Sequence, residues 1–167
     1  ALYTAPALRN LRPLLPGGGQ EGGLRSGTEA TAQIAGFARA VALRQENLAE
    51  KLRHMADIKA YCREKLLSIP GVVPVGQGEA PHILAVSLVG YPSANIVTDL
   101  GAKGICISAG SACHRGKASH VIAALKLPKK VSGGVIRLSF GPETTRADID
   151  GLYQALLDHK NQRFPML

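Results

Sequence analysis

Apolar residues recur at helical spacing over a long stretch that contains no proline. Between residues 30 and 67 the only glycine is Gly36. The apolar positions of this stretch are Ile34, Phe37, Ala38, Val41, Leu48, Leu52, Met55, Ile58, Tyr61, Cys62 and Leu66. At 1.5 Å per residue, such a helix would exceed about 50 Å, which is more than the width of a small domain. The pattern predicts a long helix that links two domains, with a break or kink near residues 54–57.

After this stretch, short apolar runs alternate with helical segments. The runs typical of strands lie at residues 72–75, 81–88, 104–108 and 135–140. The segments typical of helices lie at residues 93–100, 119–127 and 145–159. Thr145 and Asp148 have the spacing of a capping box at the start of the last helix. The order of elements predicts an α/β protein, more narrowly a two-layer α+β arrangement with helices packed on a small sheet.

The last expected strand has an arginine in its middle. Alternation puts Arg137 and Ser139 on one face, together with Val135, and puts Ile136 and Leu138 on the other face with Phe140. A charged residue at this position fits a solvated sheet face. It also fits a clamp for a carboxylate, because arginine binds carboxylates through two parallel hydrogen bonds.

A glycine-rich turn precedes the long helix. The segment 17–23 holds five glycines, and Arg25, Ser26 and Thr28 follow it. A turn of this kind at a helix start offers backbone N–H groups, hydroxyls and a guanidinium to a phosphate. The same residues could simply cap the helix, since Ser26 and Glu29 also have capping-box spacing and Thr28 is another possible cap.

Charge narrows the range of partners. The chain has 167 residues and a net charge of +8. No Asp or Glu occurs from Lys103 to Pro142, while seven Lys and Arg residues fall there, so this block attracts phosphate, carboxylate or an acidic partner. Only 4% of the residues are aromatic and no RNA-binding motif is present, which argues against nucleic acid. No apolar run reaches the ~20 residues of a membrane span, so no membrane association is expected.

One of the three cysteines has the surroundings of a nucleophile. Cys113 lies in a loop of small residues, directly before His114 and Arg115. Positive charge lowers the pKa of a thiol and raises the fraction present as the nucleophilic thiolate, although an idle surface thiol remains the alternative. Cys62 and Cys106 lie in apolar segments and are expected to be buried.

An odd number of cysteines without a Cys-x-x-Cys pair indicates no disulfide framework and a reducing, cytoplasmic location.

Three separated motifs resemble those of one enzyme family. They are residues 17–21 with 25–29, residues 108–113, and residues 136–141 with Thr144 and Thr145. In this order they resemble the C-terminal part of the cysteine desulfurases (NifS/IscS-like) of the class V aminotransferase family. The resemblance implies the small domain of a fold-type I pyridoxal phosphate enzyme, preceded by a long interdomain helix.

The resemblance also implies roles for the candidate residues. Cys113 would attack the sulfur of the substrate L-cysteine, leaving L-alanine and a Cys113 persulfide, as in sulfur transfer for iron–sulfur cluster assembly. Arg137 would hold the substrate carboxylate. Thr28, with Arg25 and Ser26, would contact the phosphate of the cofactor, which in this family belongs to the neighbouring subunit of a homodimer. A sulfur-acceptor protein is a further possible partner, and no metal is implied.

The lysine that forms the Schiff base in this family would lie before Ala1. We therefore expect residues 1–28 to be a remnant of the large cofactor-binding domain, and residues 29–167 to comprise the long helix and the small domain. On this interpretation the parent protein is the enzyme and the fragment alone is inactive. The alternatives are another member of the family, namely a selenocysteine lyase or a transaminase, and a non-catalytic module that binds anions or a partner.

Overall fold

The computed structural model of the chain describes residues 2–5, 8, 11–109 and 120–166. The chain divides into two compact units, Ala1–Asn47 and Leu48–Leu167. This division concerns the packing of the chain. The boundary expected near residue 28 concerns a domain that would precede the chain, and it stays a prediction.

The first unit holds a short 3-10 helix, Gln20–Gly23, and helix α1, Thr31–Gln45. The N-cap of α1 is Ala30, without any side-chain cap, so the capping expected from Ser26 or Thr28 is wrong. Helix α1 has no buried residue.

The long helical stretch is interrupted, but not where the sequence predicts. Helix α2 runs without a break from Leu48 to Leu67, so the kink expected at residues 54–57 is wrong. The interruption falls between α1 and α2, where Asn47 has a φ of 53°. Asparagine tolerates this left-handed conformation better than most residues, which makes it a fitting end to a helix.

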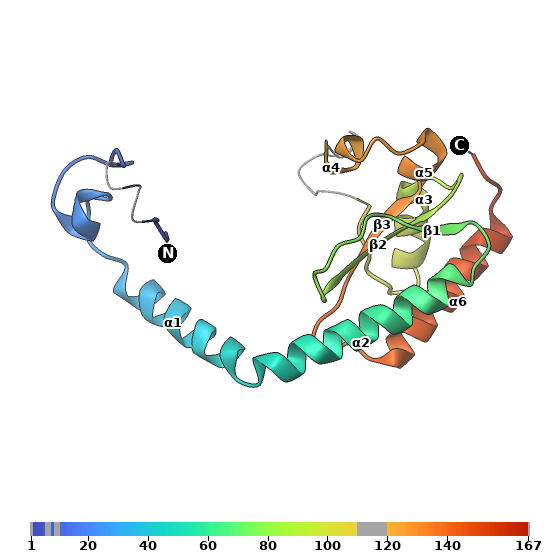
Figure 1. The fold of residues 1–167 in the computed structure, drawn as a ribbon, viewed down its shortest axis with the longest axis horizontal. Helices are drawn as coiled ribbons and strands as arrows, with labels where there is room; N and C mark the ends of the chain where they lie inside the picture. The colour runs from blue at the N-terminus through green and yellow to red at the C-terminus, as the bar shows by residue number, and fades with distance from the viewer. Residues whose placement is uncertain (1, 6–7, 9–10, 110–119, 167) are drawn as a thin grey trace. The chain divides into compact units, whose positions relative to one another are not determined.

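The second unit is built on a three-stranded antiparallel sheet (Figure 1). Strands β1 (Val72–Pro74), β2 (Ile83–Leu88) and β3 (Val135–Ser139) are ordered β1-β2-β3. The strand predicted at residues 104–108 is wrong, because this segment makes only an isolated bridge between Ser108 and Arg137. Its first residues instead form a turn on the end of helix α3, in which Ile105 N donates to Leu100 O and Gly104 has a φ of 78°.

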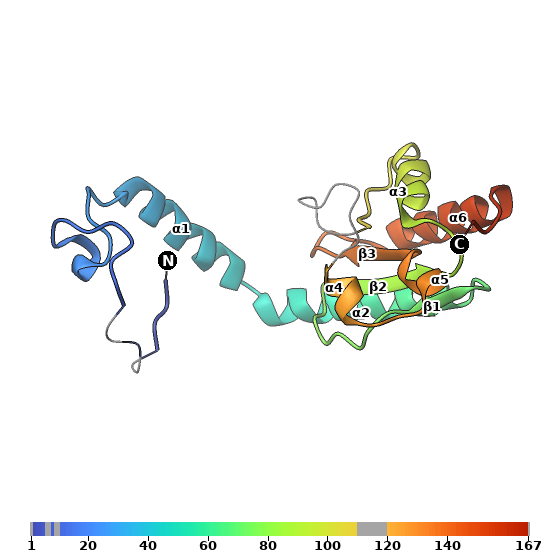
Figure 2. The same ribbon diagram turned by 90° about the horizontal axis from the view of Figure 1, so that it is seen from above.

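Helices α2, α3 (Ser93–Gly101) and α6 (Arg146–Gln162) pack on one face of the sheet (Figures 1 and 2). The two-layer α+β arrangement predicted from the sequence is therefore confirmed. One core joins the sheet and the three helices. Its fully buried side chains include Cys62 and Leu66 of α2, Val86 and Leu88 of β2, Ile96 and Leu100 of α3, Ile136 of β3 and Leu156 of α6.

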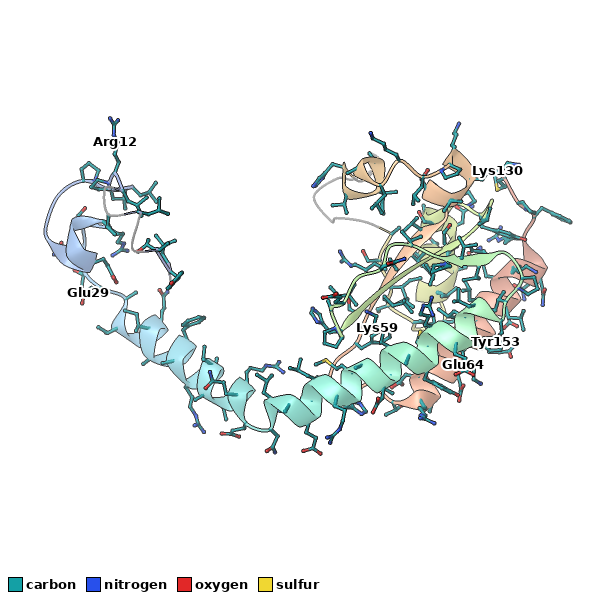
Figure 3. All side chains as sticks on the ribbon, viewed as in Figure 1. Arg12, Glu29, Lys59, Glu64, Lys130 and Tyr153 are labelled. Atoms are coloured by element: carbon teal, nitrogen blue, oxygen red, sulfur yellow. The ribbon has the colours of Figure 1, made fainter. Side chains whose placement is uncertain are left out.

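Local contacts fix the ends of the helices and the loops between them. Thr145 and Asp148 form the predicted capping box of α6 in both directions. Lys59, which projects from α2 in Figure 3, donates from Nζ to the carbonyls of Gly78 (2.6 Å) and Ala80 (2.8 Å) in the loop before β2.

Helices α4 (His120–Ala124) and α5 (Lys129–Ser132) lie between α3 and β3 in the chain. Helix α4 covers part of the helix expected over residues 119–127, whereas α5 has no counterpart in the prediction. The Ser87 hydroxyl of β2 donates to Val131 O of α5 at 2.6 Å, which attaches α5 to the sheet. None of the described helices is long and apolar enough to cross a membrane.

Candidate functional site

Arg137 occupies the middle of β3, and its side chain is exposed. Ile136 and Leu138, on either side of it, are buried in the core, and Ser139 is exposed. The alternation predicted from the sequence is thus present, except that Val135 is also buried. The guanidinium therefore projects from the sheet face opposite to the core.

The backbone N–H and C=O of Arg137 are both hydrogen-bonded to one residue, Ser108. Arg137 N donates to Ser108 O at 2.7 Å, and Ser108 N donates to Arg137 O at 3.2 Å. Ser108 is the first residue of the motif that ends at Cys113. Two sequence motifs that are far apart in the chain are thus joined by this pair of hydrogen bonds.

Cys113, the predicted nucleophile, lies outside the described residues, and its role stays a prediction. The two described cysteines differ from each other. Cys62 is buried in the core, as predicted, and burial raises the pKa of its thiol to about 12. Cys106 is exposed, so the prediction that it is buried is wrong. The reason is that Ile105 and Ile107 pack against the core and leave Cys106 on the other side of the segment.

The predicted phosphate-binding turn is stabilised by its own side chains. Arg25 donates from Nη1 to Thr28 O at 2.9 Å and to Gly27 O at 3.3 Å, while the Ser26 hydroxyl donates to Pro16 O at 3.3 Å. Gly27 has a φ of 101°, a conformation that favours glycine.

The donors of this turn fit a phosphate. Arg25 and Thr28 are exposed, and a guanidinium has five N–H groups, so Arg25 keeps donors beyond those that its own turn uses. The turn belongs to the first unit and Arg137 to the second.

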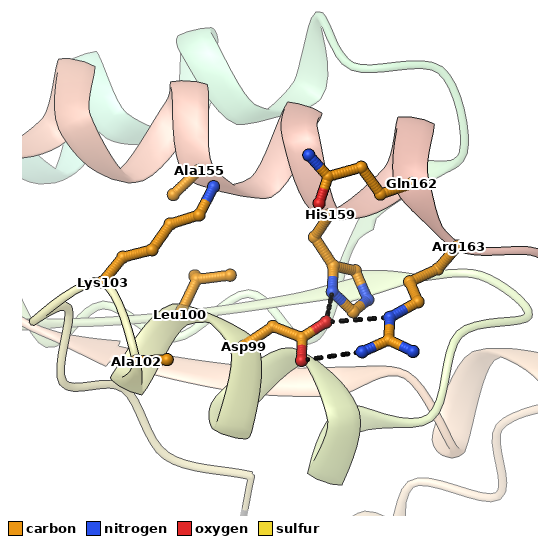
Figure 4. A pocket seen from close by; sticks show the side chains of 8 residues that line it. All are labelled: Asp99, Leu100, Ala102, Lys103, Ala155, His159, Gln162 and Arg163. Carbon is orange, nitrogen blue, oxygen red and sulfur yellow. Dashed lines mark hydrogen bonds and ion pairs between the residues drawn. The ribbon is translucent and has the colours of Figure 1, made fainter.

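A polar cluster that the sequence analysis missed connects α3 to the end of α6 (Figure 4). His159 is buried, and its Nδ1 lies 2.8 Å from Asp99 Oδ2. Arg163 donates from Nε and Nη2 to the two oxygens of Asp99, at 3.1 Å each. The guanidinium of Arg163, and secondarily His159, hold the pKa of the Asp99 carboxyl below its ordinary value. No local sequence pattern predicts this cluster, because its residues come together only when α3 packs against α6.

The cluster lines a surface hollow of about 350 Å³ together with Lys103 and Gln162. No group of three or more metal-ligating side chains occurs within the described parts of the chain.

These layers and their connections define the class of protein. A solved structure of a NifS-like protein from Rickettsia africae superposes with a TM-score of 0.78 at 27% identity, over 91% of this chain and 41% of that protein. The fold is therefore that of a domain of NifS-like enzymes.

Sequence comparison gives the family. The family model of class-V aminotransferases matches residues 1–152. The cysteine desulfurase IscS of Clostridium botulinum is 33% identical over 99% of this chain and 43% of its own length. The selenocysteine lyase of Rattus norvegicus is 33% identical over 97% of this chain and 40% of its own length. The chain belongs to the class-V aminotransferase family, and it spans less than half the length of these relatives.

Proposed function

We propose that this chain is part of a pyridoxal phosphate-dependent cysteine desulfurase that converts L-cysteine into L-alanine and a persulfide on Cys113. The observation that carries the proposal is the pair of hydrogen bonds between Ser108 and Arg137. Only residues 109–112 separate Ser108 from Cys113. A chain segment of five residues spans no more than about 18 Å even when fully extended.

Arg137 is the proposed carboxylate clamp. Its exposed guanidinium can form two parallel hydrogen bonds with the substrate carboxylate. Its backbone is hydrogen-bonded to Ser108, and the strand that carries it is paired with β2. A clamp on a rigid strand orients the rest of the substrate, so that its sulfur meets the nucleophile in a reproducible position.

Cys113 is the proposed nucleophile. Its thiolate attacks the substrate sulfur, a new S–S bond forms, and the C–S bond breaks with its electron pair left on the substrate carbon. Bound pyridoxal phosphate supplies the electron sink that makes this carbon a tolerable leaving group. The carbon then takes up a proton, and L-alanine is released.

The turn at Arg25, Ser26 and Thr28 is the proposed phosphate contact. Its exposed guanidinium and hydroxyl supply charge-assisted donors, and in a homodimer they would serve the cofactor of the neighbouring subunit. The cofactor also needs a lysine for its covalent attachment, and no lysine of this chain has the sequence context that the family uses. We therefore expect the chain alone to be inactive, and the complete protein to pass its sulfur to an acceptor protein.

The similarity to a selenocysteine lyase keeps one second candidate open, in which the same residues act on selenocysteine. Rates measured with L-cysteine and L-selenocysteine on the same complete protein separate the two activities. A selenocysteine lyase would release alanine from selenocysteine and spare cysteine.

The decisive experiment changes Cys113 in the complete, cofactor-loaded protein that contains this chain. Cys113→Ser should abolish alanine and sulfide production from L-cysteine while the cofactor stays bound, because C–S cleavage needs the thiolate. Cys106→Ser is the matched control, since this exposed cysteine has no proposed role. If Cys113→Ser turns over L-cysteine at the wild-type rate, the desulfurase proposal fails.

A second variant tests the clamp. Arg137→Ala removes a charge-assisted contact worth roughly 1.5–3 kcal/mol, so kcat/KM should fall by about one to two orders of magnitude, mainly through KM. Steady-state kinetics over a range of L-cysteine concentrations give the two constants separately. An unchanged KM would remove Arg137 from the proposed site.

A further inference from the structure

Arg137 lies between Ser108 on one side and Ala85 of β2 on the other, and its backbone hydrogen bonds go to only one of them. Both its N–H and its C=O are bonded to Ser108, and these two groups of one residue point to the same side of a strand. Neither group is therefore directed at β2, where Ala85 is the register partner of Arg137. Arg137 and Ala85 thus form a non-hydrogen-bonded pair.

The hydrogen bonds of other cross-strand pairs at the two ends of β2 and β3 agree with this assignment. Phe140 N donates to His82 O at 2.9 Å, and Leu88 N donates to Gly134 O at 3.2 Å. Bonded rows alternate with non-bonded rows along an antiparallel pair, and Ala85 falls in a non-bonded row. In such rows the Cα atoms approach to about 4.5 Å and the side chains lie closest to each other.

Ala85 is thus the residue of β2 that lies directly opposite Arg137. Directly paired residues share a face of the sheet, so the methyl group of Ala85 and the guanidinium of Arg137 lie on the same side. The adjacent Leu84 and Leu138 point into the core and are buried. A methyl group is too short to cover an arginine side chain, and Arg137 is accordingly exposed.

We propose that Ala85 is a specificity-determining position, whose small side chain keeps the edge of the Arg137 guanidinium open to a carboxylate ligand. This rests on the proposed role of Arg137 as the clamp. A two-bond contact requires the ligand to lie in the plane of the guanidinium, beside its N–H groups. A branched side chain at position 85 would occupy the space next to that edge and exclude an α-amino carboxylate.

The first test measures access to Arg137 on the chain itself. Phenylglyoxal modifies accessible arginines, and peptide mass spectrometry gives the modification rate of each one. Ala85→Leu should slow the modification of Arg137 at least threefold relative to Arg53, which is exposed on α2 and serves as the internal reference. Ala85→Ser, which keeps a small side chain, should leave the rate unchanged. Equal rates for Ala85→Leu and wild type would overturn the proposal.

The second test measures substrate binding in the complete, cofactor-loaded protein. Ala85→Leu should raise the KM for L-cysteine about tenfold or more and leave kcat within about twofold, because the variant hinders binding and leaves the thiolate in place. Ile83→Leu, a volume-conserving change on the same face, is the control for disturbance of the strand. Ala85→Val replaces Ala85→Leu if thermal melting shows that the leucine variant does not fold.

The two proposals fail in different ways. If Arg137→Ala does not raise KM, the clamp itself is wrong. If Arg137→Ala raises KM but neither variant at position 85 does so, the clamp stands and the role of Ala85 is wrong.

Discussion

At the residue scale, the second unit contains a polar cluster to which the proposed function gives no role. Asp99 accepts hydrogen bonds from both Arg163 and His159, and His159 is almost completely buried. Tyr91 adds to this arrangement, because its hydroxyl donates to the carbonyl of Lys160 at 3.3 Å. These contacts join the C-terminal end of α6 to α3 and to Tyr91 just before it, and we assign them to stability.

We predict that Asp99→Asn lowers the stability of the chain near neutral pH. We also predict that the stability of the variant falls less steeply than that of wild type as the pH is lowered. The folded state lowers the pKa of Asp99, so the ionised carboxyl contributes stability above the ordinary pKa of about 3.9. This contribution is lost as the pH falls through the lowered value. Near pH 7 the variant should lose about 1 kcal/mol, or about 4 °C in Tm, and the difference from wild type should shrink toward pH 2.

Thermal melts across pH 2–7 measure this difference. Asp57→Asn removes the same charge from an exposed position of α2 and is the control. A constant difference in Tm between Asp99→Asn and wild type over the whole pH range would contradict the prediction.

At the element scale, the ends of helices depend on single side chains. Helix α6 starts with a reciprocal capping box, in which the Thr145 side chain accepts from Asp148 N at 3.2 Å and Thr145 N donates to Asp148 Oδ2 at 2.8 Å. Helix α1 starts at Thr31, and its N-cap residue Ala30 makes no such contact. The backbone N–H groups at the start of α6 are thus better satisfied by the chain's own side chains than those of α1.

Thr145→Ala should therefore destabilise the second unit by about 1 kcal/mol, because the Thr145 hydroxyl no longer accepts from Asp148 N or donates to Asp148 Oδ2. Thr98→Ala is a suitable control. The Thr98 hydroxyl only donates back to Ala94 O within α3, and alanine is the better helix former. Urea denaturation gives both free energies of unfolding. Equal effects of the two substitutions would show that the capping box is not important.

The elements that the sequence predicts well are those with local signals. The capping box predicts the start of α6, and the alternation from Ile136 to Phe140 predicts β3 and the exposed position of Arg137. The apolar run at residues 104–108 has no local pattern to show that it forms no strand. Its first backbone N–H groups are instead hydrogen-bonded in the turn after α3. The break at Asn47 is equally hidden, since asparagine also occurs inside helices.

The candidate site residues can likewise be predicted only where a local sequence pattern marks them. Arg137 can be found from its strand, and Arg25, Ser26 and Thr28 from the glycines around them. The pairing of Arg137 with Ala85 and Ser108 depends on the register between segments distant in sequence. Such a register is set by core packing and by no local pattern, so the sequence alone does not single out Ala85.

At the scale of the whole molecule, burial is distributed unequally. Helix α1 has no buried residue, whereas the described core belongs to the unit from Leu48 to Leu167. Isolated helices of this length are marginal in water, since most helical stability in proteins comes from packing.

We therefore expect backbone amides of α1 to exchange with solvent far faster than those of β2 and α6. Hydrogen exchange of the chain, followed by mass spectrometry, should show α1 deuterated within the earliest time points while the buried part of α6 stays protected up to global unfolding. Measurements at two protein concentrations control for self-association. Protection of α1 equal to that of α6 at both concentrations would contradict the expectation.

The long connection between β2 and β3 has a consequence for how the chain folds. These paired strands are separated by all of residues 89–134, whereas β1, β2 and the end of α2 are close together in sequence. Closing a long loop costs entropy before its contacts can compensate, so contacts between distant segments form late. We expect α2, β1 and β2 to associate first and β3 to dock last. The residue proposed to hold the substrate would then be among the last to reach its final position.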